Sequence, residues 1–259
     1  MKYFLTLLCC MGFFSFLFGQ DFSAYEKRVF EDGNGGTLNY RILYPAKYKP
    51  NKKYPLVFFL HGAGERGSDN EKQLTHGGKL FLEKKNRKKY PAIVVFPQCP
   101  QDDYWAHMLE NRKDGLRLRE FPEMPEPRKA LGQAMQLLEK LVKEESVDTD
   151  RVYVMGLSMG GMGTFEILSR MPEHFAAAIP ICGGGNPTLV DRYAKNTSLW
   201  IFHGLKDDVV LPRYSEQMHE ALKAAGGDVK YTAFPEANHN SWDPTFAQPD
   251  LLKWLFSHK

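Results

Sequence analysis

The sequence predicts an α/β fold: one open, mostly parallel sheet with helices covering both of its faces. The first reason is that short β-rich segments alternate with segments of helical periodicity along the chain. The second is that the inner β-rich segments, "PLVFFL" and "AIVVF", are continuous apolar runs, as expected of strands buried on both faces. The third is size, since 259 residues that are 43% hydrophobic can build one large core.

Eight segments are expected to be strands, because each is short, apolar and rich in β-branched or aromatic residues. In chain order they are 27–31, 38–43, 55–60, 92–96, 152–155, 177–181, 199–202 and 230–234.

Five segments between them are expected to be helices. The clearest is 128–145, where apolar residues recur at helical spacing directly after Pro127, a residue favoured in the first turn. Two glycines, Gly226 and Gly227, mark the end of another. The five are 72–85, 128–145, 158–170, 212–225 and 250–257.

The segment 98–126 does not fit this alternation. It is long and irregular, it contains Trp105, and it leaves through a proline-rich stretch. Long connections of this kind are uncommon unless they are functional or disordered. This one begins where a parallel strand ends, on the side where such sheets bind ligands. We expect a lid or a substrate-contacting loop, with a mobile surface loop as the alternative.

The N-terminus has the layout of a secretory signal peptide. One lysine is followed by an uncharged apolar stretch, 3–18, and then by Gly19. This stretch is short for a membrane-spanning helix. The sequence therefore predicts a signal peptide at 1–19 and a single domain at 20–259. That domain is expected to be secreted or periplasmic, with no stable membrane insertion once the peptide is cleaved. An uncleaved N-terminal anchor is the alternative.

Charge and cysteine usage exclude several classes. The formal net charge is +3, and acids interleave with the bases, as in "EKKNRKKYP", so no nucleic-acid partner is expected. No Cys-x-x-Cys or zinc helix occurs, so no metal site is expected. Cys99 and Cys182 follow predicted strands that should lie three apart, about 14 Å. A disulfide needs Cα atoms within about 7 Å, so we expect two free, buried thiols.

The run "VYVMGLSMGGMGTFEIL" places one serine between glycines at the junction of a predicted strand and a predicted helix. This is the strand–turn–helix pattern of a nucleophile elbow, in which Ser158 is held on a sharp bend. Gly156 and Gly160 would remove the Cβ atoms that collide across such a turn. The alternative is a plain glycine-rich turn in which Ser158 caps the following helix.

A serine nucleophile needs a base, and an acid to orient that base, in the chain order Ser, Asp/Glu, His. "HGLKDD" places Asp207 and Asp208 just past the strand after next, and "EANHNSWD" places His239 past the last strand. We choose Asp207 and His239. His203 lies within the acid motif, where a hydrogen bond that braces the turn is expected. The remaining histidines considered and set aside are His76, His107, His174 and His219.

Backbone donors for an oxyanion are expected at two turns. One is the N–H of Met159, directly after the serine and at a helix N-terminus. The other is the N–H of Ala63, in the glycine-rich turn "HGAGERG" after the third strand. The alternative is a generic or phosphate-binding turn, but this one lacks the Gly-Lys-Ser/Thr ending of a P-loop.

With these residues in hand, 37–258 resembles the α/β-hydrolase superfamily. It looks most like the secreted bacterial phospholipase/carboxylesterase and predicted-peptidase branch, which is related to feruloyl, polysaccharide-acetyl and polyhydroxybutyrate-depolymerase-type esterases. The motifs that carry the likeness are "LHGAGERG", "PQCP", "GLSMGG", "HGLKDD" and "HNSWD".

This resemblance implies an eight-stranded, nearly all-parallel sheet, a Ser-Asp-His triad and no cofactor. The family pattern also places the acid at Asp207, the base at His239 and the oxyanion donors at Ala63 and Met159. In "DDVVLP" the proline comes one residue later than in many relatives. That departure puts the shape of the loop in doubt, but not the acid.

The sequence therefore predicts a secreted serine hydrolase that cleaves carboxylic esters through an acyl-enzyme, with a small-molecule or polysaccharide-linked ester as its substrate. Acetyl and feruloyl esters on polysaccharides are candidates. A serine peptidase of the prolyl-oligopeptidase type is the alternative enzyme. A catalytically silent module that binds glycans or lipids is the alternative of another class. Trp105 and Trp242 are candidates either for the pocket wall or for the core.

Overall fold

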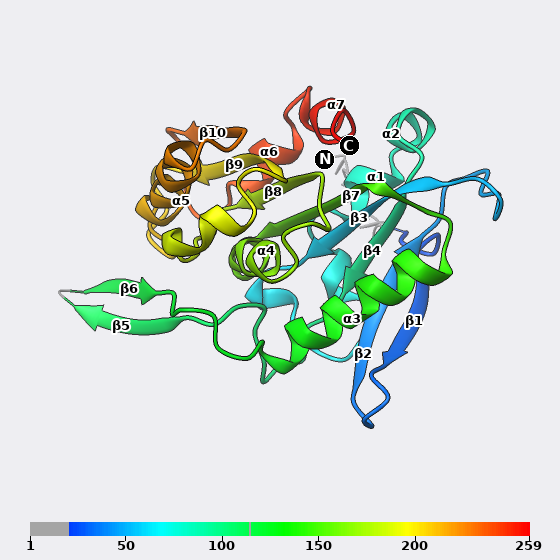
Figure 1. Cartoon of the computed structure of the whole chain (residues 1–259), viewed down its shortest axis with the longest axis horizontal. Helices are drawn as coiled ribbons and strands as arrows, with labels where there is room; N and C mark the ends of the chain where they lie inside the picture. The colour runs from blue at the N-terminus through cyan, green and yellow to red at the C-terminus, as the bar shows by residue number, and fades with distance from the viewer. Residues whose placement is uncertain (1–20, 114) are drawn as a thin grey trace, which may run out of the picture.

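The computed structural model describes residues 21–113 and 115–259. In them, eight strands form one sheet in the order β1-β2-β4-β3-β7-β8-β9-β10, and β5 and β6 form a separate hairpin (Figure 1). Only β2 runs against its neighbours in the large sheet, because it pairs antiparallel with both β1 and β4 and the other pairs are parallel. The predicted mostly parallel α/β sheet is confirmed, whereas the predicted signal peptide lies outside the described residues.

The eight predicted strands are all present, with ends close to those expected, apart from one early start. β7 begins at Val147 rather than at residue 152, because Val147 pairs with Tyr54 across a register shift. The polar residues 148–151 hide this extension in the sequence. The strands of the sheet are β1 (Glu26–Glu31), β2 (Thr37–Leu43), β3 (Tyr54–Leu60), β4 (Ile93–Pro97), β7 (Val147–Leu157), β8 (Ala177–Ile181), β9 (Ser198–Gly204) and β10 (Val229–Phe234).

Four of the five predicted helices form as expected, but the helix expected at 72–85 is wrong. Three short segments replace it, because Gly77 adopts a left-handed φ of 87° and Glu83 leaves the helical region. The helices are α1 (Gly78–Leu82), α2 (Lys84–Lys89), α3 (Lys129–Glu144), α4 (Met159–Arg170), α5 (Arg213–Ala224), α6 (Trp242–Phe246) and α7 (Leu251–Leu255), with 3₁₀ turns η1 (Ala63–Glu65), η2 (Lys72–Leu74) and η3 (Pro187–Arg192).

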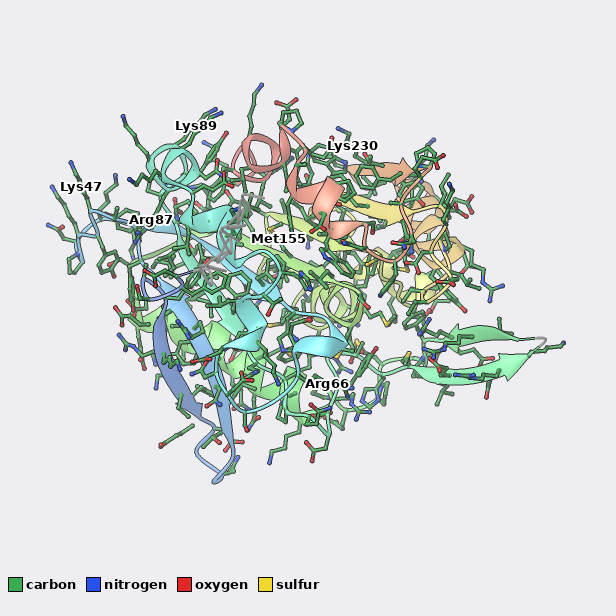
Figure 2. The ribbon with its side chains drawn as sticks, turned by 180° about the vertical axis from the view of Figure 1, so that it is seen from behind. Lys47, Arg66, Arg87, Lys89, Met155 and Lys230 are labelled. Carbon is green, nitrogen blue, oxygen red and sulfur yellow. The ribbon has the colours of Figure 1, made fainter. Side chains whose placement is uncertain are left out.

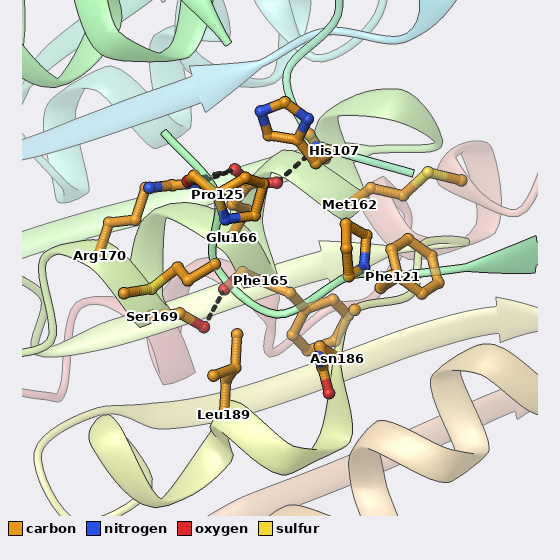
Figure 3. A pocket seen from close by; sticks show the side chains of 14 residues that line it. His107, Phe121, Pro125, Met162, Phe165, Glu166, Ser169, Arg170, Asn186 and Leu189 are labelled. Carbon is orange, nitrogen blue, oxygen red and sulfur yellow. Dashed lines mark hydrogen bonds and ion pairs between the residues drawn. The ribbon is translucent and has the colours of Figure 1, made fainter. Parts of the chain in front are cut away.

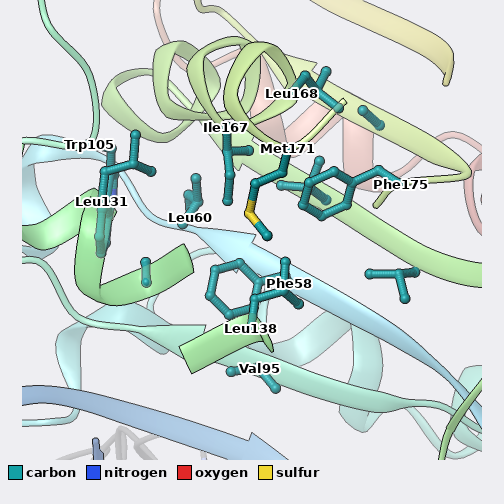
Figure 4. Packing of buried hydrophobic residues seen from close by; sticks show 14 of the residues in the cluster. Phe58, Leu60, Val95, Trp105, Leu131, Leu138, Ile167, Leu168, Met171 and Phe175 are labelled. Carbon is teal, nitrogen blue, oxygen red and sulfur yellow. The ribbon is translucent and has the colours of Figure 1, made fainter. Parts of the chain in front are cut away.

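The sheet separates two hydrophobic cores, as its continuous apolar strands require. Along β3, Phe58 and Leu60 face a core shared with α3, α4 and α5. Val57 and Phe59 face the other core, which includes residues of α1 and α7. Figure 4 shows the first core from close by. This packing fixes the carboxyl ends of the parallel strands along one edge, where the polar loops collect.

The segment 98–126, expected to be irregular, contains the hairpin of β5 (Leu109–Lys113) and β6 (Leu116–Glu120). Opposite views show this hairpin projecting from the body of the molecule (Figures 1 and 2). The sequence did not reveal it, because β5 has no apolar alternation and every described residue of β5 is exposed. The alternation in β6, "LRLRE", spans only five residues.

The base of the hairpin segment is fastened to α4 by hydrogen bonds to an ion pair on that helix (Figure 3). Arg170 Nη2 and Glu166 Oε1 lie 2.7 Å apart, and both side chains are largely buried. Glu166 Oε2 also accepts the backbone N–H of His107 at 2.6 Å. Arg170 Nη2 also donates to the carbonyl of Pro125 at 2.6 Å. The chain is thereby held to one turn of one helix where it enters and where it leaves the segment.

Two further expectations concern cysteines and membranes. Cys99 and Cys182 are buried free thiols, and the strands that they follow, β4 and β8, are three apart in the sheet. Within residues 21–113 and 115–259, no helix is both long and apolar enough to cross a membrane.

Candidate active site

Ser158 sits on a strained bend between β7 and α4. Its φ of 53° and ψ of −114° lie outside the regions that L-residues usually adopt. The bend depends on two glycines. A Cβ at Gly156 would lie 2.2 Å from the carbonyl oxygen of Gly160, and a Cβ at Gly160 would lie 1.9 Å from that of Leu60. The first collision is the one expected across the turn. The second is with the neighbouring strand β3.

The structure brings Ser158, Asp207 and His239 together from the ends of three strands. His239 Nε2 lies 2.9 Å from Ser158 Oγ, and His239 Nδ1 lies 2.8 Å from Asp207 Oδ2. A carboxylate only accepts, so Nδ1 carries the proton and Nε2 is free to accept the proton of the serine. The Asp207 side chain is 0% exposed and that of His239 is 21% exposed, so the base faces the solvent side and the acid does not.

Asp207 is held as a carboxylate by the groups around it. Burial alone would raise its pKa. Hydrogen bonds from His203 and His239, the charge of His239 and the N–H of Val210 instead hold that pKa well below the usual range. Oδ1 accepts the backbone N–H groups of Val209 and Val210, each at 2.9 Å. Asp208, the sequence alternative, is exposed.

His203 braces Asp207 through the same carboxylate oxygen that His239 contacts. Its Nε2 lies 3.1 Å from Asp207 Oδ2 and 2.8 Å from the carbonyl oxygen of Val210. Both of these partners are acceptors, so Nε2 carries a proton. Nδ1 lies 2.7 Å from Ser215 Oγ, which ties the acid loop to α5. The bracing bond expected of this histidine is therefore made to the acid itself.

The two residues chosen as oxyanion donors each begin a helical turn. Met159 is the first residue of α4 and Ala63 the first of η1. The first N–H groups of a helix have no carbonyl partner within it. Neither N–H is therefore committed to a carbonyl of its own helix, as an oxyanion donor requires.

His61, which sequence reasoning missed, holds the Ala63 turn in place. Its Nδ1 lies 2.6 Å from the carbonyl oxygen of Gly62, and its Nε2 accepts the N–H of Cys99 at 2.9 Å. Trp105 Nε1 donates to its carbonyl at 3.1 Å. Burial lowers the pKa of His61 to about 4, so the ring is neutral and Nε2 remains an acceptor. The only signal in the sequence was the position of His61 at the head of "HGAGERG".

A cleft of about 900 Å³ opens over Ser158 and His239. The segment 98–126 contributes to its wall, with Tyr104 and Met108 among the lining residues. Of the two tryptophans, Trp242 lines the cleft, with its ring edge-to-face to His239 at 5.5 Å. Trp105 is fully buried in the core.

Comparison with protein families identifies the chain. The model of the dienelactone hydrolase family matches residues 109–247, more than half of the sequence. The chain belongs to the dienelactone hydrolase family. The predicted resemblance to the α/β-hydrolase superfamily is thereby confirmed, and the chain is a hydrolase.

This member of the dienelactone hydrolase family is similar to esterases of known structure. It is 34% identical to a thermostable esterase, with a TM-score of 0.81, over 92% of this chain and 64% of that one. A ferulic acid esterase from Anaeromyces mucronatus has a TM-score of 0.62 at 18% identity, over 85% and 86% of the two chains. At that identity the likeness shows the fold alone.

Curated relatives of this dienelactone hydrolase family member include both esterases and peptidases. A bifunctional acetylxylan esterase/xylanase of Neocallimastix patriciarum is 34% identical over 32% of this chain. Dipeptidyl-peptidase 5 of Porphyromonas gingivalis is 23% identical over 77% of it. The chain spans only 14% and 28% of the lengths of these two relatives.

One group of potential metal ligands coincides with this site. Among the described residues of this dienelactone hydrolase family member, Cys182, Asp207 and His239 have ligand atoms within 4.8 Å of one another. Asp207 and His239 already bind each other, and burial raises the pKa of the Cys182 thiol. Because a metal binds the thiolate, this group is poorly suited to hold one.

The buried neutral His61 makes the stability of the fold sensitive to pH. Unfolded histidine has a pKa near 6.5, against about 4 in the fold. Between these values only the unfolded chain takes up the proton, so stability is lost as the pH falls through this window. We expect the His61 contribution to unfolding free energy to drop by about 2 kcal/mol from pH 7 to pH 5.

Urea denaturation at both pH values measures this loss. In His61→Gln the corresponding part of the pH dependence should disappear. An identical pH dependence in the wild type and in the variant would contradict the assignment.

Proposed function

We propose that the chain is a secreted serine hydrolase that cleaves carboxylic esters through an acyl-enzyme. The observation that carries this proposal is the continuous hydrogen-bonded line from Ser158 Oγ through the His239 ring to Asp207 Oδ2. Such a line is the arrangement that makes a serine hydroxyl nucleophilic. Acetyl and feruloyl esters on polysaccharides are the candidate substrates, and the relative named as an acetylxylan esterase/xylanase supports the acetyl esters.

In the proposed reaction Ser158 Oγ attacks the acyl carbon and its proton passes to His239 Nε2. Asp207 stabilises the imidazolium that results. The carbonyl oxygen of the ester becomes an oxyanion and accepts the N–H groups of Ala63 and Met159. His239 then protonates the leaving alcohol, and water, deprotonated by the same ring, releases the acid.

Secretion is part of this proposal. It is supported by the apolar layout of 3–18. It is also supported by a relative in Arthroderma benhamiae, 24% identical over 85% of this chain, whose name describes it as a secreted protein.

Peptide hydrolysis is the second candidate, because several relatives with this fold are peptidases. The same triad can cleave either bond. We favour esters because the relatives that share 34% identity with this chain are esterases, and because an ester has the better leaving group.

Parallel assays separate these activities. We expect the purified protein to hydrolyse p-nitrophenyl acetate and a feruloyl ester, with an aminoacyl p-nitroanilide much slower in kcat/KM. A fluorophosphonate probe should label Ser158. Faster cleavage of the anilide would favour the peptidase, and a serine that does not react with the probe would favour a silent binding module.

A further inference from the structure

The β5–β6 hairpin has two chemically different faces. Residues paired across the strands lie on the same face. Glu110 pairs with Arg119 and Arg112 pairs with Arg117, so these four share one face, while Lys113 lies on the other. Glu110, Arg117 and Arg119 also line the cleft that contains Ser158. The face that carries three arginines is therefore the one turned toward the cleft.

Arg119 fixes this face beside the acid loop. Its Nη1 donates to the carbonyl of Val209, two residues after Asp207, and its Nη2 lies 3.0 Å from Glu110 Oε2. Its backbone N–H donates to the hydroxyl of Tyr214 at 2.6 Å. The side chain is only 4% exposed, yet its Nε has no hydrogen-bond partner in the described part of the chain. A buried donor at the cleft wall is left unsatisfied.

Arg112 and Arg117 lie farther out along the same face. They stand directly opposite each other, an arrangement of like charges that destabilises a two-stranded ribbon. Both are exposed, and neither forms an ion pair with another described residue.

Among the described residues, the two glutamates that line this cleft are both paired with groups other than the two outer arginines. Glu110 is engaged by Arg119, and Glu65 Oε1 lies 3.7 Å from His76 Nε2. The Arg112–Arg117 pair forms no ion pair that would stabilise the described part of the fold. An anionic ligand would offset the repulsion between these two charges.

We propose that the β5–β6 hairpin binds the carboxylates of an acidic polysaccharide whose ester group lies at Ser158. This rests on the proposed function. The planar guanidinium matches a carboxylate in geometry and charge. Because the arginines run outward from the cleft, a chain that repeats its carboxylates engages more of them than a single small acid does. The rings of Tyr104 and Trp242 line the same cleft and offer apolar surface for sugar rings.

Binding to an ester-free acidic oligosaccharide tests this surface without any turnover. Calorimetry with oligogalacturonate should show binding that weakens when NaCl is raised from 20 to 500 mM, because the Debye length shortens from about 20 Å to about 4 Å. A neutral galactan oligosaccharide of the same length should bind much more weakly. Arg117→Ala should weaken oligogalacturonate binding about fivefold, the effect of losing one exposed charge contact.

Lys113→Ala is the matched control, because it removes one positive charge from the same hairpin on the opposite face. It should leave oligogalacturonate affinity and p-nitrophenyl acetate hydrolysis close to those of the wild type. Four results would overturn the proposal: no binding, equal binding of the neutral oligosaccharide, tighter binding of an oligoglutamate peptide, or equal losses in Arg117→Ala and Lys113→Ala. If the esterase proposal were wrong, the protein would neither cleave esters nor be labelled by the probe at Ser158. These two results are separate from the binding measurements.

Discussion

Replacing Ser158 with alanine is expected to lower kcat for ester hydrolysis by about 10⁶, with little change in KM. The variant loses the oxygen that lies 2.9 Å from His239 Nε2 and attacks the acyl carbon in the proposed reaction. The proposed oxyanion donors at Ala63 and Met159 would remain, so a small rate above that of water should persist. Initial rates with p-nitrophenyl acetate measure the effect.

Ser257→Ala is the control for this substitution, because Ser257 is exposed and lies far along the chain, two residues after α7 ends. It should retain wild-type turnover and the fluorophosphonate label, while Ser158→Ala should lose both. Thermal unfolding of both variants checks that the elbow is intact. A folded Ser158→Ala protein with wild-type turnover would eliminate the acyl-enzyme mechanism.

The second large effect is expected from Asp207→Asn, at about 10⁴ in kcat. Asparagine preserves the shape but removes the charge that stabilises the imidazolium. Its amide can also present N–H to His239 Nδ1, which favours the tautomer with its proton on Nε2. That tautomer cannot accept the proton of Ser158.

Asp208→Asn is the matched control, since it makes the same chemical change one residue away on an exposed side chain. It should leave kcat near the wild-type value. Because the pKa of Asp207 is held well below its usual range, the difference between the two variants should persist across ordinary assay pH. Equal rates for the two variants would show that Asp207 does not act on His239.

The parts of the site that the sequence could predict depend on local patterns. Ser158, Asp207 and His239 each follow a short apolar segment, and parallel strands bring their carboxyl ends to one edge. Short motifs with fixed spacing therefore determined three positions that are far apart in the chain. Of the two neighbouring aspartates, Asp207 was chosen as the acid, and the family pattern supported that choice.

The parts that escaped prediction depend on contacts between distant segments. His61 gains its role only when β4 places the N–H of Cys99 beside its ring. Trp105 and Trp242 are chemically identical, so the sequence could not tell which of them lines the cleft. In the fold, α4 packs against Trp105 in the core, and Trp242 lines the cleft. The β5–β6 hairpin has no apolar alternation in β5 and only a five-residue alternation, "LRLRE", in β6, so its sequence was read as an irregular loop.

The Glu166–Arg170 ion pair has an evolutionary consequence. Because one helical turn holds the backbone at both His107 and Pro125, the residues between those points form a cassette with fixed ends. The number and the charge of these residues can change while the backbone stays bound to α4 at both ends. Evolutionary change in these residues would therefore alter the wall of the cleft and leave the bend at Ser158 in place.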